Sequence, residues 1–147
     1  FAHAVSGASQ GGAVDLGAGS RASLWAGDAA SWIDLHPAVA TVSRVWGMHD
    51  AFQVGEATVG GGGRASIWSG SAASWEDLSL ALPVEFSNSR ANGVSSDGIN
   101  LYVTGSGFNS NTGRVEALLW TRPIPSPGAA AVLGLGSLMA LRRRRER

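Results

Sequence analysis

The residues able to do chemistry are few and lie far apart along the chain. The three histidines are His3, His36 and His49, and no His-x-x-x-His or His-Glu-x-x-His spacing joins them. Cysteine is absent, which excludes thiolate metal sites and disulfide bonds. No Gly-x-Ser-x-Gly elbow occurs, and the serines near Asp34 or His49 form no triad pattern. We therefore predict no catalytic, cofactor-binding or metal-binding residue.

Two groups of residues with side-chain oxygens also lack the spacing that a calcium site or a catalytic carboxylate pair requires. Asp97, Asn109 and Asn111 could offer ligands to calcium, but no Asp-x-Asp-x-Asp-Gly series supports such a loop. Glu76 and Asp77 are adjacent, so in a strand they would point to opposite faces, which is wrong for a paired acid and base. We interpret the first group as loop turns.

Two glycine-rich stretches imitate a dinucleotide fingerprint. "GAGSRA" from Gly17 and "GGGGRA" from Gly60 match Gly-x-Gly-x-x-Ala, a motif that needs a strand before it and a helix after it. Here a strand-like "SLW" or "SIW" follows instead. The glycines are therefore predicted to be turn residues, and so is His36, which lies in "DLHP" at a repeat boundary and is replaced by Ser79 in the next copy.

Length and charge distribution limit the class of protein. The chain has 147 residues, 44% of them apolar and 15% charged, which fits one ordinary globular domain. Every basic residue is arginine, and five of the eleven arginines follow Leu141. Residues 1–141 hold six arginines and ten acidic residues, a net charge of −4. An acidic body with a basic terminus argues against nucleic-acid binding, which uses a basic face.

An internal repeat dominates the body of the chain. Residues 21–35 read "RASLWAGDAASWIDL" and residues 64–78 read "RASIWSGSAASWEDL", an offset of 43 residues. A weaker third copy, "VEALLWTRP", aligns Ala117, Leu119 and Trp120 with the corresponding apolar residues of the first two copies. Repetition at a fixed period of this size is typical of propellers and related arrays.

The residue pattern within one copy predicts strands. In "RASIW", Ala65 and Ile67 alternate with Ser66 and Trp68, the period of two expected of a strand, and Asp97-Gly98 is a suitable tight turn. We predict an all-β body over residues 1–122 made of tandem four-stranded antiparallel, propeller-like blades, with the tryptophans filling the space between sheets. The units are expected at about 1–35, 36–78 and 79–122.

The set of blades is expected to be incomplete. The first unit is predicted to begin at its second strand, the middle unit to be complete, and the last to stop after its third strand at Trp120. Propellers close with about four to eight blades, so these units could not close a ring. Phe1 is not an initiator methionine, and "AHA" at residues 2–4 imitates a signal-peptidase site. We expect an N-terminal truncation that removed a signal peptide and further repeats.

The end of the chain reads as a short membrane helix. Residues 129–141 are thirteen residues without a charge, after a proline-rich linker at 123–128. As a helix this run would reach about 20 Å, short of a bilayer core of about 30 Å. Ser126 could cap the helix and Pro127 suits its first position. The alternatives are a buried core helix and a solvated or nucleic-acid-binding basic tail.

An arginine cluster after the apolar run would set the orientation of such a helix. Arg142 and Arg143 could snorkel into the headgroup layer and lengthen a marginal span. Residues 129–147 are therefore predicted to be a single transmembrane helix with a cytoplasmic arginine-rich end, and the body to face the other side. The residues expected to carry this signal are Arg142, Arg143, Arg144 and Arg145.

Residues 124–147 resemble the PEP-CTERM sorting signal of bacterial surface proteins. A proline-x-proline motif, a short Ala/Leu/Gly helix and an arginine cluster follow one another at the C-terminus, with Pro125, Ser126 and Pro127 as the motif. The family's usual Glu between the prolines is Ser126 here. The resemblance implies recognition by a membrane-embedded exosortase that cuts near the proline motif.

The body resembles a second family, the HAF family of predicted extracellular repeats. "GVSSDGINLYVTG" followed by "EALLW", and "QVG" followed by "RASIW" and "SWEDL", carry the likeness over nearly all of residues 1–120. Repeats of this family often accompany PEP-CTERM tails.

Together these features predict a function outside the cytoplasm. The leading hypothesis is an exported, non-enzymatic surface protein that needs no cofactor, anchored by its C-terminus, whose loops bind a matrix polysaccharide, a neighbouring cell or another surface protein. The alternative is a fragment of an exported propeller-type enzyme such as a glycosidase, with its catalytic residues in missing blades. A cytosolic kelch-like adaptor is opposed by the tail.

Overall fold

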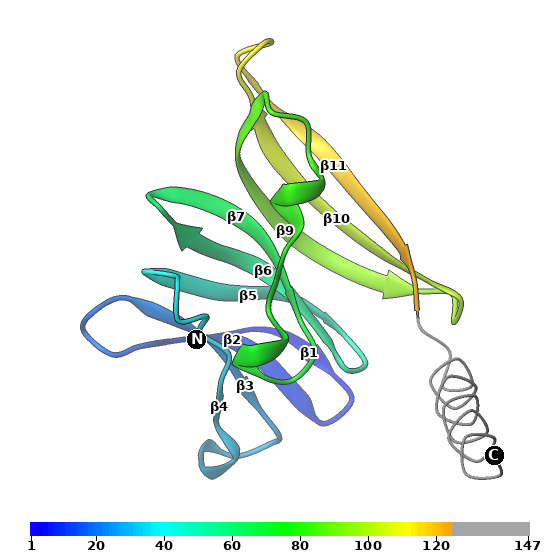
Figure 1. The fold of residues 1–147 in the computed structure, drawn as a ribbon. Coiled ribbons are helices and arrows are strands. Elements are labelled where there is room, and N and C mark those ends of the chain that lie inside the picture. The colour runs from blue at the N-terminus through cyan, green and yellow to red at the C-terminus, as the bar shows by residue number, and fades with distance from the viewer. Residues whose placement is uncertain (125–147) are drawn as a thin grey trace, which may run out of the picture.

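The computed structural model describes residues 1–124, so the predicted sorting motif, membrane helix and arginine cluster lie outside the described residues. The described chain is all-β and forms three antiparallel sheets that follow one another from the N-terminus (Figure 1). Short 3-10 helices occur only in connections, and no helix of residues 1–124 is long and apolar enough to cross a membrane.

Sheets A and B each contain four strands in chain order. Sheet A is made of β1 (Ala2–Ser6), β2 (Ser9–Asp15), β3 (Ser20–Trp25) and β4 (Ile33–Asp34), with η1 (Ala29–Ser31) before β4. Sheet B is made of β5 (Val42–His49), β6 (Phe52–Val59), β7 (Gly62–Trp68) and β8 (Glu76–Asp77), with η2 (Ala72–Ser74) before β8. The two copies of the repeat thus supply the third and fourth strands of successive sheets.

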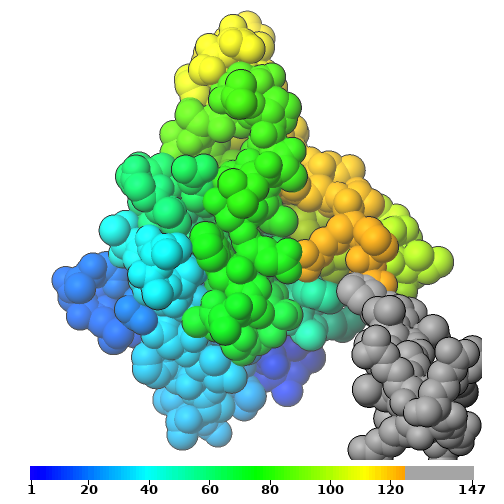
Figure 2. All heavy atoms as spheres, viewed as in Figure 1, coloured from blue at the N-terminus to red at the C-terminus, as the bar shows by residue number. Residues whose placement is uncertain are grey.

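Sheet C contains three strands within the described residues. It is made of β9 (Phe86–Ser96), β10 (Asn100–Asn109) and β11 (Arg114–Pro123), in the order β11-β10-β9. The segment that joins β8 to β9 includes η3 (Leu78–Ala81) and runs down the middle of the visible face, between the sheets (Figure 2, green). Over residues 1–124 the three sheets do not close into a ring.

One expectation about the first unit is wrong. Sheet A does not begin at its second strand, because Ala2–Ser6 forms a complete first strand paired with β2. Its sequence "AHAVS" has little in common with the matching strand of sheet B, "VSRVWGMH". The strand is defined by its pairing with β2, and its own amino-acid sequence does not predict it.

A bulge next to a glycine recurs in all three sheets. In each sheet the register of the first strand against the second shifts by one residue. A Cβ on the glycine opposite the bulge would overlap a backbone carbonyl oxygen in the first strand or directly before it. These contacts are Gly12 with Phe1 (1.9 Å), Gly55 with Arg44 (1.9 Å) and Gly105 with Arg90 (2.1 Å). Only glycine allows this approach, so the bulge is a built-in feature of the unit.

Two apolar clusters lie between the sheets. Between sheets A and B, Ala22, Leu35, Val45 and Trp68 are buried together. Between sheets B and C the buried residues come from β6, β7, β9 and β10, with Trp120 packed against them; they are Val54, Ala65, Ile67, Ala91, Leu101 and Val103. The predicted alternation in β7 is confirmed, because Ala65 and Ile67 face sheet C while Trp68 faces sheet A. Sheet stacking is therefore the main source of apolar burial.

The turns before the fourth strands repeat in detail. Ser31 Oγ accepts the N–H of Ala26 at 2.7 Å, and Ser74 Oγ accepts that of Ser69 at 2.8 Å. The second tryptophan of each copy then donates its indole N–H to a strand serine. The pairs are Trp32 with Ser23 (3.0 Å) and Trp75 with Ser66 (2.9 Å). These tryptophans therefore anchor the turn onto the sheet.

The glycine-rich stretches are turns, as predicted. Gly17 and Gly19 lie between β2 and β3 with φ of 83° and 124°, and Gly60 and Gly61 lie between β6 and β7 with φ of 61° and 82°. Each turn leads into a strand. Neither stretch has the helix that a dinucleotide site requires.

Candidate functional site

The structure brings together one serine and one histidine that the sequence did not pair. Ser43 Oγ lies 2.7 Å from Nδ1 of His36, and Nε2 of His36 lies 3.0 Å from the carbonyl oxygen of Ala40. Since a carbonyl only accepts, the network assigns the proton to Nε2 and leaves Nδ1 to accept the Ser43 hydroxyl proton. This arrangement has the form of a serine activated by a base.

The surroundings of this pair assign it a structural role. Ser43 is 0% exposed, and its Oγ also accepts the backbone N–H of Ala22 in sheet A at 2.9 Å. A catalytic nucleophile must reach substrate, and this hydroxyl is enclosed between two sheets. Ser43 and His36 therefore fasten sheet B to sheet A.

Sheet B repeats this fastening without the histidine. Ser89 of β9 is buried, and its Oγ accepts the backbone N–H of Ala65 at 3.0 Å. At the position that matches His36, Ser79 binds the Asp77 carboxylate and accepts a hydrogen bond from Arg64. A serine of the following sheet thus satisfies the same amide in sheets A and B, with or without an imidazole.

Asp34 supports the linker that carries His36. Its Oδ1 accepts the backbone N–H of His36 at 2.9 Å, and its Oδ2 accepts the Nε–H of Arg21 at 3.0 Å. Partial burial alone would raise the pKa of Asp34, but the hydrogen bonds from Arg21 and His36 together lower that pKa below its ordinary value. The carboxylate contacts the main chain of His36 and not its ring, so it does not complete a triad.

The remaining histidines and acidic groups are dispersed over the described residues. The rings of His3 and Trp46 lie 4.5 Å apart between centroids, and His49 Nε2 lies 3.5 Å from Asp50 in an exposed turn. Within residues 1–124 no three His, Asp or Glu side chains are grouped to hold a metal ion. Of the histidines and acidic residues named from the sequence, the fold therefore brings His36 and Asp34 into one network with Ser43.

The three candidate calcium ligands lie at opposite ends of one strand. Asp97 precedes β10 and Asn109 ends it. Asp97 Oδ1 accepts the N–H groups of Ile99 and Asn100, and these bonds together with the Tyr102 hydroxyl lower its pKa to about 2. Asn109 Oδ1 accepts the N–H of Asn111 in the other turn. Both groups are therefore turn residues, as the sequence interpretation has it.

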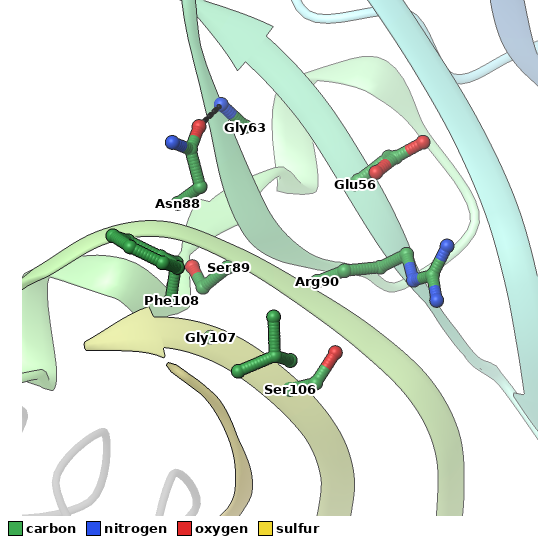
Figure 3. Close-up of a pocket in the computed structure, with 9 residues that line it drawn as sticks. Glu56, Gly63, Asn88, Ser89, Arg90, Ser106, Gly107 and Phe108 are labelled. Carbon is green, nitrogen blue, oxygen red and sulfur yellow. Dashed lines mark hydrogen bonds between the residues drawn. The ribbon is translucent and has the colours of Figure 1, made fainter. Parts of the chain in front are cut away.

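An open cleft lies between sheets B and C (Figure 3). Asn88 and Phe108 stand toward one end of it, and Glu56 and Arg90 toward the other. Asn88 Oδ1 accepts the N–H of Gly63 at 2.8 Å, which fixes the amide, while the Phe108 side chain is 39% exposed. Ser106 adds a hydroxyl.

The charged side chains at one end of the cleft already have partners within the protein. Arg44 Nη1 donates to Glu56 Oε1 at 3.2 Å, and the guanidinium of Arg90 lies 5.6 Å from the centre of the Trp46 ring. Glu56 is the only carboxylate among the lining residues, so the cleft lacks the two carboxylates of a glycosidase. An aromatic face beside amide and hydroxyl groups suits binding of a neutral polar ligand. No pattern in the sequence indicated this cleft, because its residues come from two sheets.

Comparisons with protein-family models, with curated proteins and with solved structures found no match to this chain.

Proposed function

We propose that this chain is an exported cell-surface repeat protein with a binding or structural role in the cell envelope or extracellular matrix. The observation that carries the proposal is the reuse of one stacking contact at both sheet interfaces, Ser43 on Ala22 and Ser89 on Ala65. Ser43 and His36, the one serine–histidine pair among residues 1–124, belong to the first of these contacts. A body built this way is a rigid support for surface loops and clefts, the usual arrangement of a binding protein.

In this proposal the sheets are propeller-like blades. The support is the sequential antiparallel order within each sheet, the face-to-face stacking of neighbours and the period of 43 residues. Three blades are fewer than the four or so at which propellers close.

The ligand in this proposal is a polysaccharide, bound in the cleft of Figure 3. Sugar rings carry apolar C–H faces that pack on an aromatic side chain, and hydroxyls that pair with amide and hydroxyl groups. Phe108, Asn88 and Ser106 supply these partners.

Retention of matrix polysaccharides on a column tests the ligand. The wild-type chain should be retarded by at least one polysaccharide, and Phe108→Ala should remove most of that retardation. Ile99→Ala changes an exposed apolar residue in the distant β9–β10 turn and serves as the matched control. Equal retardation of the wild type and Phe108→Ala would exclude this cleft.

The anchor in this proposal is the C-terminal tail, which resembles a PEP-CTERM signal. Pro125, Ser126 and Pro127 form the motif for an exosortase, the following apolar run inserts into the membrane, and the arginines at 142–145 stay on the cytoplasmic side. The support is the order of these three features in the sequence.

Cell fractionation tests the anchor. Behind a signal peptide, the chain should remain with membranes through a carbonate wash, and deletion of residues 124–147 should release it. Replacing Arg142–Arg145 with serine should alter the topology seen in a protease-protection assay. A full-length chain that washes off the membrane contradicts the anchor and leaves the ligand proposal standing.

A further inference from the structure

The cleft between sheets B and C holds one charged side chain for which the proposed polysaccharide has not yet given a role. Phe108, Asn88 and Ser106 serve the sugar rings and their hydroxyls. Arg90 also lines the cleft and lies beside Ser106, its pairing partner across β9 and β10 (Figure 3). Among the described residues that line the cleft, Arg90 is the one basic side chain.

The counterpart of Arg90 in sheet B is Arg44. Each arginine directly follows the buried serine that binds an amide of the preceding sheet. Each also pairs, across the first two strands of its sheet, with the residue that follows the bulge glycine. That residue is Glu56 in sheet B and Ser106 in sheet C.

Arg44 binds two partners of different chemistry. Its Nη1 donates to a carboxylate oxygen of Glu56 at 3.2 Å, and its Nη2 donates to the hydroxyl of Ser20 in the preceding sheet at 3.3 Å. One guanidinium therefore binds a carboxylate and a hydroxyl together, which its planar fork of donors allows.

Both of these partners are replaced at Arg90. Ser106 takes the place of the glutamate, and Gly63, at the position that matches Ser20, takes the place of the hydroxyl. The two replacements lie in sheet C itself and in the sheet before it, so they do not depend on where the chain begins or ends. Within residues 1–124 the Arg90 guanidinium makes no ion pair and no side-chain hydrogen bond.

Trp46 holds the Arg90 guanidinium in place without giving it an acceptor. The central carbon of the guanidinium lies 5.6 Å from the centre of the Trp46 ring, within the range of a cation–π contact. A ring face has no carboxylate or hydroxyl oxygen, so the N–H groups of Arg90 still lack the acceptors that Arg44 has. Arg90 is therefore positioned at the cleft with unused donors.

We propose that the polysaccharide of this cleft is acidic, and that the carboxylate of a uronic acid unit binds Arg90. The inference rests on the proposed function and names the class of polysaccharide. One uronic acid ring carries both groups that Arg44 binds, a carboxylate and neighbouring hydroxyls. The ligand thus supplies to Arg90 what Glu56 and Ser20 supply to Arg44 within the protein.

The remainder of the cleft suits a sugar ring next to that carboxylate. Phe108 follows Ser106 by two residues along β10, which places both on one face about 7 Å apart along the strand. One sugar unit or two neighbouring units span that distance. Since serine is smaller than the glutamate it replaces, the ligand carboxylate has room beside the guanidinium.

The charge of the body opposes general attraction of polyanions. Residues 1–124 contain six arginines and ten acidic residues, a net charge of −4. Glu56, the carboxylate that lines the cleft, keeps its pair with Arg44. An acidic polymer is therefore repelled by most of the body, and a contact with Arg90 is local.

Binding of the same polymers with and without charge tests the inference. The full 147-residue chain, in a mild detergent, is titrated with polygalacturonate and alginate and with their methyl esters, which keep the rings and lose the charge. The wild type should prefer at least one acid over its ester by about tenfold, and Arg90→Gln should abolish this preference. Arg122→Gln removes an equal charge from an exposed ion pair at the other end of β11 and should keep the preference.

Returning the internal carboxylate provides the second readout. In Ser106→Glu the new side chain takes the position that Glu56 has in sheet B, so it should pair with Arg90 and remove the preference for the acid. Ser106→Gln introduces a side chain of the same size without the charge and should keep the preference.

The outcomes distinguish this inference from the proposed function. A wild type that binds neither acid better than its ester overturns the inference. An Arg90→Gln chain that keeps the full preference also overturns it, because binding would then come from other cations such as the arginines at 142–145. Phe108→Ala should weaken binding of acid and ester alike. If it weakens neither, the cleft is wrong as a polysaccharide site, whereas Phe108-dependent binding without a preference for the acid leaves the proposed function standing.

Discussion

Sheets A and B are close copies in sequence, yet their tryptophans have different surroundings. Trp25 and Trp68 hold the same register position, opposite Gln10 and Gln53. Trp68 is 0% exposed because sheet A covers it, whereas Trp25 is partly exposed and borders a surface pocket. Burial in this protein is therefore decided by the neighbouring sheet and not by the unit's own sequence. Equivalent substitutions in the two sheets should therefore have unequal effects.

The largest expected difference is between the two tryptophans themselves. Trp68→Ala removes a fully buried ring and should lower the free energy of unfolding by about 3 to 5 kcal/mol. Trp25→Ala should cost about 1 kcal/mol, since part of its ring already contacts water. Trp120→Ala, in a partly buried ring, should fall between them. Urea unfolding at low protein concentration measures all three, and equal losses for Trp25 and Trp68 would remove the basis of the comparison.

Substitution of the bulge glycines should cause the next largest loss in the free energy of unfolding. In Gly55→Ala the new Cβ would lie 1.9 Å from the Arg44 carbonyl oxygen in the middle of the stack, and we expect a loss of about 3 kcal/mol. Gly12→Ala meets the Phe1 carbonyl at the same distance but should cost less, because Phe1 is exposed and its backbone can shift.

A neighbouring glycine in sheet B serves as the control for this substitution. A Cβ on Gly62 would have no heavy atom closer than 3.6 Å, and the φ of Gly62 lies outside the left-handed region. Gly62→Ala should therefore leave the urea midpoint nearly unchanged. A Gly55→Ala chain as stable as Gly62→Ala would show that the bulge is not required.

Alanine substitutions of the two interface serines, Ser43 and Ser89, should differ by a smaller amount in the free energy of unfolding. Ser89→Ala leaves the buried Ala65 N–H without its acceptor and should cost about 1 to 3 kcal/mol. Ser43→Ala removes the acceptor of Ala22 and also the donor to His36, so its loss should be the larger. Hydrogen exchange at the Ala22 and Ala65 amides reports each site, and it should accelerate only at the amide whose serine was replaced.

The smallest expected effect is electrostatic and belongs to sheet A. The folded-state pKa of Asp34 is lowered below its ordinary value of 3.8, so its ionised form stabilises the fold above that pH. This contribution is fully present at neutral pH and is lost as the pH falls through the lowered folded-state pKa. Unfolding free energies of wild type and Asp34→Asn should therefore converge in acid, and a constant difference from neutral to acidic pH would contradict this cause.

The sequence predicted those parts of the fold that depend on contacts within one repeat unit. The alternation of Ala65 and Ile67 with Ser66 and Trp68, and the turn at Asp97-Gly98, follow from local period and turn chemistry. The first strand of sheet A was missed, because no alternation marks it and only its partner defines it. The same reason explains why the sequence did not reveal the stacking contacts.

The sequence did not predict the candidate site either, because its residues come from different units of the repeat. Ser43 matches Ser89 at an offset of 46 residues while the main repeat runs at 43, so the serines do not align in a simple comparison. The cleft needs Glu56 from sheet B and Phe108 from sheet C, which no spacing rule connects. Membership in either resembling family stays a prediction.

The short fourth strands have a consequence for how such a chain can change over generations. Because β4 and β8 are two residues long, the amides of Ala22 and Ala65 remain open to a serine of the next unit. Each unit thus carries one half of a joint at each side, and the halves are alike from unit to unit. Adding or deleting one whole unit would therefore preserve the serine-to-amide contact on which each interface is built.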